Sequence, residues 1–153
     1  MEAYCRIDTV TITIHEEIAE PNIVIVGDPG IMDSVDVCRG LKKGGIVIVN
    51  TVKKAEDLKL NAENVITIDA SAIALKHFGR LILNTVMLGA FCKVSDVVAL
   101  ETVKKAIREK LGGSGKFSDK IVDSNIAAIQ EVYDLVKAEK AVAVAGKAKA
   151  GKR

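Results

Sequence analysis

The chain has 153 residues, of which 49% are hydrophobic and 27% charged, and its formal net charge is +2. This composition excludes a disordered protein and fits one compact domain, whose core must be aliphatic because aromatic residues make up only 3%. No apolar run approaches the roughly 18 to 20 residues that cross a bilayer, and the first residues lack the pattern of a secretory signal. We therefore expect a cytoplasmic protein that does not contact membranes.

The charge is unevenly distributed along the chain. Residues 137–153 carry six basic side chains and one acidic side chain, which leaves residues 1–136 with a net charge of −3. We expect residues 139–153 to form a flexible basic tail of alanine, lysine and glycine, because no side chain there is large enough to anchor it. A mildly acidic body argues against nucleic-acid binding, which needs basic side chains gathered on one folded surface.

The first segment alternates polar and apolar residues and predicts an antiparallel hairpin. Its two strands are Tyr4–Ile7 and Val10–Ile14, and in the second strand the branched apolar residues share one face while threonines share the other. A threonine face indicates that one side of the hairpin stays in contact with water, as at the margin of a sheet.

Three later runs are rich in β-branched residues and apolar at odd and even positions alike, which is typical of strands buried on both faces. They lie at residues 23–26, 46–49 and 65–68. Their spacing suits the crossovers of parallel strands, and a helix is expected at about Ile31–Cys38 after the first run. The predicted fold is α/β, with three layers and a mostly parallel sheet. An N-terminal antiparallel hairpin and helices concentrated in the C-terminal half complete the prediction.

The second half of the chain predicts helices. Ser71 is expected to cap a short helix that Gly79 ends, and Asn84 to cap the next helix, residues 85–94. That next helix is apolar around most of its circumference, which indicates that a neighbouring chain covers it. An amphipathic helix follows at residues 100–111, and a longer one begins at Ser118.

The sequence shows no catalytic constellation and no metal site. The glycines before Lys116 follow a helix rather than a strand, so they do not fit a phosphate-binding loop. Cys5, Cys38 and Cys92 have neither the spacing of zinc ligands nor that of a redox pair. We predict no catalytic residue and no metal ligand in this chain.

A small ligand, if one binds, is expected in the crevice beyond the carboxyl ends of the parallel strands. The cofactor-binding candidates at that place are Asp28, Asn50, Thr51, Asp69 and Ser71, and Asn84 is a further candidate. Each of them can equally be a turn or capping residue.

Four segments stand out by their order and spacing: residues 20–29, Gly44–Thr51, Ile68–Ala70 and above all Asn84–Phe91. Together they resemble the gamma subunit of pyruvate:ferredoxin oxidoreductase and related 2-oxoacid:acceptor oxidoreductases, and the resemblance covers nearly all of residues 4–137. Members of that family normally begin with a strand and a G-x-G-G-Q-G turn ahead of the part that matches Tyr4–Ile14. We therefore expect residues 1–138 to be an N-terminally incomplete gamma-type α/β domain.

The resemblance implies a structural subunit that is not catalytic alone. Its complex would use coenzyme A to decarboxylate a 2-oxoacid oxidatively, most simply pyruvate, and would pass the electrons to ferredoxin. The complex would hold thiamine diphosphate, magnesium, iron–sulfur clusters and coenzyme A mainly on partner subunits of alpha, beta and delta type, so that ferredoxin is contacted only indirectly. Two other classes stay open: a stand-alone α/β module that binds a small ligand or nucleotide, and a homodimeric scaffold domain.

Overall fold

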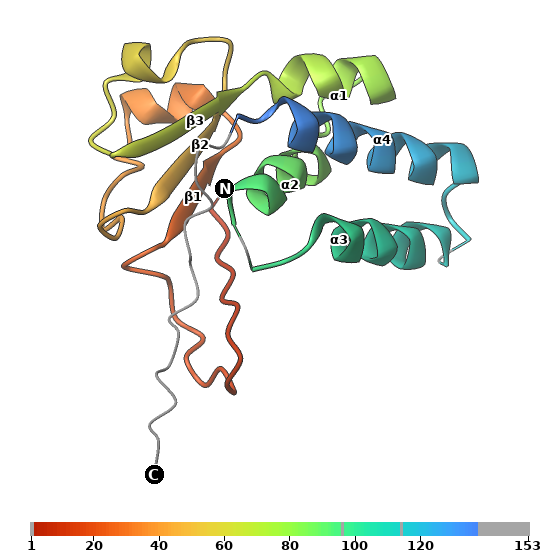
Figure 1. Cartoon of the computed structure of the whole chain (residues 1–153), viewed down its shortest axis with the longest axis horizontal. Helices are drawn as coiled ribbons and strands as arrows, with labels where there is room; N and C mark the ends of the chain where they lie inside the picture. The colour runs from red at the N-terminus through yellow and green to blue at the C-terminus, as the bar shows by residue number, and fades with distance from the viewer. Residues whose placement is uncertain (1, 96, 114, 138–153) are drawn as a thin grey trace.

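The computed structural model describes residues 2–95, 97–113 and 115–137 (Figure 1). The tail predicted at residues 139–153 lies outside these described residues. Within them the chain forms one parallel sheet followed by four α-helices, so the expected concentration of helices in the C-terminal half is confirmed.

Three parallel strands make the sheet in the order β1-β2-β3, namely β1 (Ile23–Val26), β2 (Ile46–Asn50) and β3 (Asn64–Ile68). The register pairs Ile23 with Ile46 and Ile46 with Asn64. All five residues of the central strand β2 are buried, which confirms that its unbroken apolar run marks a strand covered on both faces.

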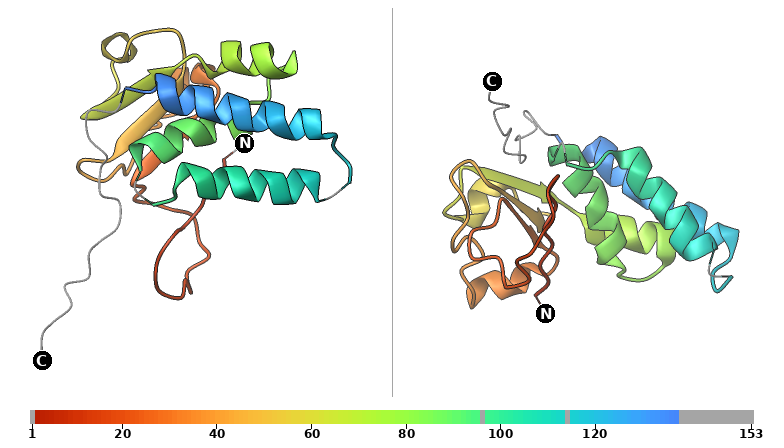
Figure 2. Two further views of the ribbon diagram at one scale, coloured as in Figure 1. Left: turned by 45° about the vertical axis from the view of Figure 1, so that its right-hand side comes forward. Right: turned by 90° about the horizontal axis from the view of Figure 1, so that it is seen from below.

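The two faces of β2 belong to two different hydrophobic cores. Ile46 and Ile48 pack on the helical side, whereas Val47 and Val49 pack beneath the two crossovers that join the strands. Each crossover contains a 3-10 turn, η1 (Pro29–Asp33) and η2 (Ala55–Leu58). The sheet therefore has helices on one face and short turns and loops on the other (Figure 2).

The helix expected at Ile31–Cys38 is not formed. The chain makes only the short η1 turn there, and two aspartates bind the backbone locally: Asp28 Oδ1 accepts from the Gly30 amide and Asp36 Oδ1 from the Cys38 amide, both at 3.0 Å. Such side-chain bonds give the backbone an alternative to helical hydrogen bonds.

The helices are α1 (Ala70–Phe78), α2 (Leu83–Val94), α3 (Leu100–Ile107) and α4 (Asp119–Leu135). A π-helical turn, Arg108–Gly112, continues α3, so the helical path expected at residues 100–111 is kept with a change of pitch. Gly79 ends α1 in the left-handed conformation, as predicted, with φ of 66°. The helix predicted to begin at Ser118 begins one residue later, at Asp119, with Ser118 in the N-cap position but without a side-chain cap hydrogen bond.

The expectation that a neighbouring chain covers α2 is wrong, because α1, α4 and the sheet of this same chain bury it. Met87 is only 4% exposed, and Val86, Ala90 and Val94 are fully buried. Gly89 makes this packing possible: a Cβ atom there would lie 2.3 Å from the Ile129 carbonyl oxygen on α4. The close approach of two helices, which no periodicity reveals, hides the apolar surface.

The predicted N-terminal hairpin is absent, since residues 2–22 form neither strand nor helix. We call residues 2–20 the arm: its two legs run side by side and project from the body (Figure 1). The Arg6 side chain donates to the carbonyl oxygens of Glu16 and Glu17, at 3.0 Å each, and Asp8 Oδ1 accepts from the Thr9 amide at the tip. A two-stranded ribbon without a third strand is marginally stable in water, which explains why alternation alone does not produce one here.

Candidate functional site

A buried asparagine links two loops at the carboxyl edge of the sheet. The side chain of Asn50, at the end of β2, is 5% exposed. Its Nδ2 donates to the Gly27 carbonyl oxygen at 2.8 Å and to Ser71 Oγ at 2.9 Å, and its Oδ1 accepts from the Ser71 amide at 3.1 Å. Asn50 therefore fixes the turn after β1 to the first turn of α1.

Two aspartates at the same edge cap helical turns. Asp28 is the N-cap of η1, and Asp69 is the N-cap of α1, where its Oδ1 accepts from the Ala72 amide at 2.9 Å. The predicted cap was Ser71, which instead lies inside the first turn and binds Asn50. A carboxylate suits the positive end of a helix, so Asp69 occupies the place where an anionic ligand would otherwise bind.

Thr51, the residue after β2, lies at the same edge and makes two hydrogen bonds. Its Oγ1 accepts from the Lys53 amide at 3.2 Å, while its own amide donates to the Ile68 carbonyl oxygen at 3.0 Å. The first of these bonds shapes the turn after β2, and the second holds that turn beside the end of β3.

Asn84 does not belong to the edge. It lies in the first turn of α2, at the end of α1 remote from Asp69, and its Oδ1 accepts from the Thr85 amide at 2.9 Å. The residue before the helix is Ile82, without a side-chain cap, so the prediction that Asn84 caps α2 is wrong. The helix begins two residues earlier than predicted, at Leu83, an apolar residue that packs against the core.

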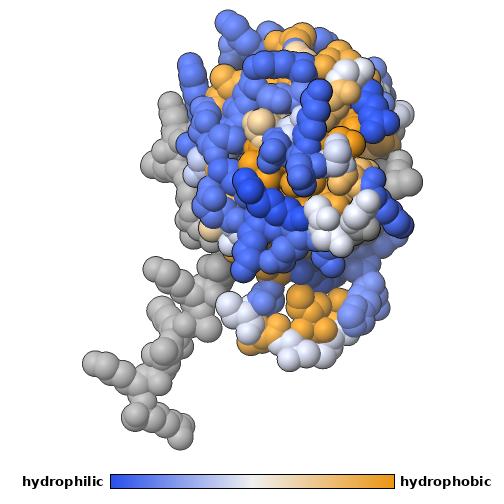
Figure 3. All heavy atoms as spheres, turned by 90° about the vertical axis from the view of Figure 1, so that its right-hand side faces the viewer, coloured by the Kyte–Doolittle hydropathy of each residue, from blue (hydrophilic) through white to orange (hydrophobic). Residues whose placement is uncertain are grey.

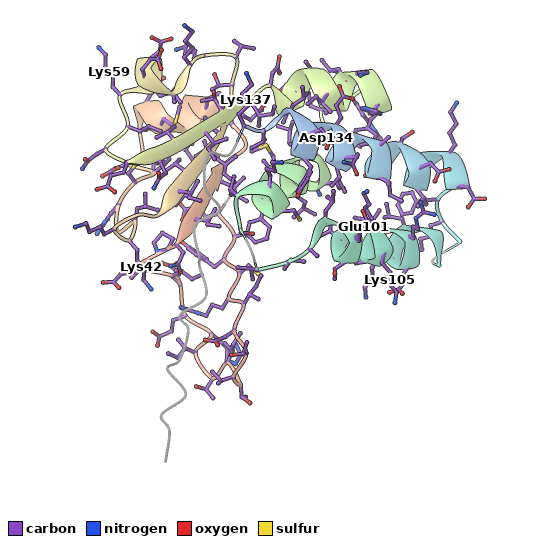
Figure 4. The ribbon with its side chains drawn as sticks, in the orientation of Figure 1. Lys42, Lys59, Glu101, Lys105, Asp134 and Lys137 are labelled. Atoms are coloured by element: carbon purple, nitrogen blue, oxygen red, sulfur yellow. The ribbon has the colours of Figure 1, made fainter. Side chains whose placement is uncertain are left out.

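An open depression of about 820 Å³ lies beside the edge, between the two crossovers. It is lined by apolar residues below and by charged and hydroxyl residues at its rim, among them Asp33, Thr51, Lys53, Asp57 and Lys59. Figure 4 places Lys59 beside η2, far from Glu101 and Lys105 on α3. The rim carries both signs of charge, so this surface is polar without a strong field of either sign.

A polar cluster lies between α1 and α4 that the sequence did not predict. Glu131 Oε1 accepts from Lys76 Nζ at 2.8 Å, and Glu131 Oε2 lies 2.7 Å from His77 Nε2. The hydrogen bond from Lys76, and then that from His77, holds the pKa of Glu131 below its usual range. Because the partners lie more than fifty residues apart, only the helix packing brings them together.

The three cysteines lie in different parts of the fold. Cys38 is buried beneath the crossovers, Cys92 is buried in α2, and Cys5 is exposed on the arm. Burial raises the pKa of the Cys38 and Cys92 thiols. In the part of the chain that the structure describes, no three His, Cys, Asp or Glu side chains form a group able to hold a metal ion. Among the same residues, no helix is long and apolar enough to cross a membrane.

Comparison with known proteins places the chain among oxidoreductase subunits. Residues 1–135 match the family model described as pyruvate ferredoxin/flavodoxin oxidoreductase. The chain is 42% identical over 136 residues to the pyruvate/ketoisovalerate oxidoreductases common subunit gamma of Thermococcus kodakarensis, a match that covers 86% of this chain and 70% of that protein. It is 43% identical over 132 residues to pyruvate synthase subunit PorC of Methanocaldococcus jannaschii, covering 86% of this chain and 69% of that protein.

A solved structure agrees with these matches. The crystal structure of pyruvate oxidoreductase subunit PORC from Thermotoga maritima superposes with a TM-score of 0.69 at 34% sequence identity. The superposition covers 78% of this chain and 66% of the Thermotoga chain, so the present chain spans about two thirds of the length of that relative.

Proposed function

The chain belongs to the pyruvate ferredoxin/flavodoxin oxidoreductase family as a gamma-type subunit, and we propose on this premise that it works within a complex that oxidises a 2-oxoacid. The reaction would convert the 2-oxoacid, most simply pyruvate, and coenzyme A to acyl-coenzyme A and carbon dioxide, with ferredoxin as the electron acceptor. The observation that carries the proposal is the match over residues 1–135, which spans both the sheet and the four helices.

We propose a structural role for this chain in that complex, with residues 1–138 as its folded domain. The polar side chains at the carboxyl edge support this role, because they already serve the fold: Asn50 ties two loops together, and Asp28 and Asp69 cap helical turns. Groups engaged in this way shape a defined surface at this edge of the sheet. The catalytic groups would come from partner subunits of alpha, beta and delta type.

We propose that partner subunits also hold thiamine diphosphate, magnesium and the iron–sulfur clusters. The separation of Cys5, Cys38 and Cys92 supports this, since an iron–sulfur cluster needs several cysteine ligands at one place. Coenzyme A, when bound, supplies the thiol that accepts the acyl group. We propose this surface as part of the wall along which coenzyme A reaches the reaction centre, with Lys53 and Lys59 as the individual side chains that contact its phosphates although carboxylates share the rim.

The test is reconstitution of the complex from co-expressed subunits, with and without this chain. The complete complex is expected to reduce ferredoxin in a reaction that needs both 2-oxoacid and coenzyme A, and the chain alone is expected to be inactive. Replacing Lys53 and Lys59 by glutamate should raise the KM for coenzyme A about tenfold, whereas Lys42→Glu should leave it unchanged. Turnover by the isolated chain, or full activity of a complex that lacks it, would refute the proposal.

A further inference from the structure

The end of the helical layer that lies farthest from the sheet carries a local excess of positive charge. Residues 104–123, which run from α3 through the π-helical turn into α4, hold six basic and three acidic side chains, a net charge of +3, whereas residues 1–136 as a whole carry −3. Figure 3 looks onto this end, where long hydrophilic side chains surround smaller apolar areas. We define the distal patch as five exposed side chains of this segment: Arg108, Lys110, Phe117, Lys120 and Ile121.

The fold does not neutralise the three cations of the distal patch. The two lysines that precede them on α3 are paired, one with Glu101 at 2.7 Å and the other with Glu109 at 3.9 Å. Among the residues that the structure describes, no carboxylate lies within ion-pair distance of Arg108, Lys110 or Lys120. Exposed lysines and arginines are common on protein surfaces, so a docking surface needs a second feature besides this charge.

That second feature is apolar. Phe117 is 42% exposed and Ile121 41%, and they lie on either side of the first residues of α4. The π-helical turn that carries Arg108 and Lys110 contacts α4, so these cations and the two apolar side chains belong to one surface. An apolar centre with charged neighbours is typical of a protein–protein contact, in which apolar burial stabilises the complex and the charges orient the partners.

The backbone beneath the distal patch is held in place by α4. A Cβ atom at Gly112 would lie 3.9 Å from a methyl carbon of buried Val122, so the π-helical turn packs directly on α4. Buried Asn125 donates through Nδ2 to the Ile121 carbonyl oxygen at 2.7 Å. Turns of this kind are rare and are frequently found at functional sites. A surface held in this way loses little conformational freedom when a partner docks on it.

The charge of the distal patch selects the kind of partner. Two copies of the chain related by a two-fold axis would bring their distal patches, and therefore like charges, together, which disfavours a homodimer at this surface. Two exposed carboxylates in the same segment, those of Asp119 and Asp123, would repel a row of phosphates, which disfavours nucleic acid and anionic lipid. An acidic protein face can place carboxylates opposite the three cations and apolar side chains opposite Phe117 and Ile121.

We propose that the distal patch docks onto an acidic face of a neighbouring subunit, with its two apolar side chains at the centre of the contact and its three cations around them. This inference rests on the proposed function, since the neighbour is another subunit of the complex. Figure 4 places Lys105 on α3 far from Lys59 beside the depression, so this contact is separate from the proposed wall for coenzyme A.

The experiment measures the affinity of the full chain for its co-expressed partner subunits. Arg108→Glu with Lys120→Glu should weaken binding at least about tenfold, whereas the control Lys42→Glu with Lys43→Glu, an equal change of charge at exposed residues before β2, should weaken it less than about twofold. Raising the salt from about 50 to about 500 mM should weaken binding of the wild type about tenfold but not that of the first double variant, because salt screens exposed charges. Phe117→Ala should weaken binding about fivefold at both salt concentrations.

Cross-linking identifies what the cations touch. A zero-length carbodiimide reagent joins lysine amines to carboxylates, so in the assembled complex mass spectrometry should find Lys110 or Lys120 joined to an aspartate or glutamate of a partner subunit. The circular dichroism of every variant should match that of the wild type, because all the replaced side chains are exposed.

The outcomes separate this inference from the proposed function. Equal effects of the two double variants on assembly, or cross-links of these lysines only to a second copy of this chain, would overturn the docking inference alone. Binding of the wild type to phosphatidylglycerol vesicles that Arg108→Glu with Lys120→Glu abolishes, together with unchanged assembly of that variant, would overturn the choice of partner and favour a membrane surface. If the wild-type chain forms no complex with its partner subunits, the proposed function itself fails.

Discussion

Replacing Asn50 by alanine tests whether the carboxyl edge of the sheet is held by one side chain. The substitution removes three hydrogen bonds, two to Ser71 and one to the Gly27 carbonyl oxygen, from a side chain that is 5% exposed. At about 1 kcal/mol for each bond, the free energy of unfolding should fall by about 3 kcal/mol. For a domain of this size, that corresponds to a melting temperature lower by about 6 to 12 °C.

The assay is urea and thermal unfolding of the full chain, followed by far-ultraviolet circular dichroism because the chain has no tryptophan. The control is Thr51→Ala at the next position, which removes one hydrogen bond from a partly exposed side chain and should cost less than about 1 kcal/mol. A loss below about 1 kcal/mol for Asn50→Ala, or equal losses for both variants, would show that the edge is held in another way.

Three further predictions concern the helical layer. Gly89→Ala should cost about 1 to 3 kcal/mol in urea unfolding, because the new methyl group would collide with the Ile129 carbonyl oxygen. Met87→Asp should unfold the isolated chain, seen as loss of its helical circular dichroism, because Met87 is 4% exposed within this chain rather than at a contact between chains. Glu131→Gln should cost about 0.5 to 1 kcal/mol at pH 7 and progressively less as the pH falls below 4.5, measured as the difference in free energy of unfolding from the wild type.

The sign of the last prediction follows from the lowered pKa of Glu131, caused first by the hydrogen bond from Lys76 and then by that from His77. A carboxylate whose pKa is depressed in the folded state stabilises it above the unfolded pKa, about 4.5, and loses that contribution as the pH falls through the folded pKa. A difference between Glu131→Gln and the wild type that stayed constant from pH 7 into the acid range, or grew there, would contradict this account.

Controls for the helical variants come from exposed positions. In Gly112→Ala, the nearest atom to the new methyl group apart from its neighbours along the helix is a methyl carbon of Val122, 3.9 Å away. This is an ordinary contact distance, so the substitution should be nearly neutral. Glu101→Gln should change stability by less than about 1 kcal/mol, because Glu101 is 80% exposed although it pairs with Lys104. A cost for these controls equal to that of Gly89→Ala or Met87→Asp would mean that the burial of Gly89 and Met87 is not what makes those two positions sensitive.

The strands illustrate what local pattern can predict. The runs of branched apolar residues at Ile23–Val26, Ile46–Asn50 and Asn64–Ile68 do form strands, as predicted. Burial on both faces, however, is confirmed only for the central strand β2; β1 and β3 lie at the edges of the sheet, and Ile25 of β1 is 42% exposed. Five of the six candidate site residues also lie at one edge, because parallel strands bring their carboxyl ends together. The exception, Asn84, was assigned from a helix start that the packing of Leu83 moved.

The amino-acid sequence by itself determined the elements whose signal is local: the parallel strands, the C-terminal helices, and the glycine that ends α1. Tertiary structure decided what depends on partners distant in the sequence. It buried α2 against α4 through Gly89, gathered Glu131 with Lys76 and His77, and made Asn50 a link between two loops. It also left residues 2–20 without main-chain hydrogen bonds between their two legs, because alternation specifies which faces a strand presents but does not by itself supply a stable pairing.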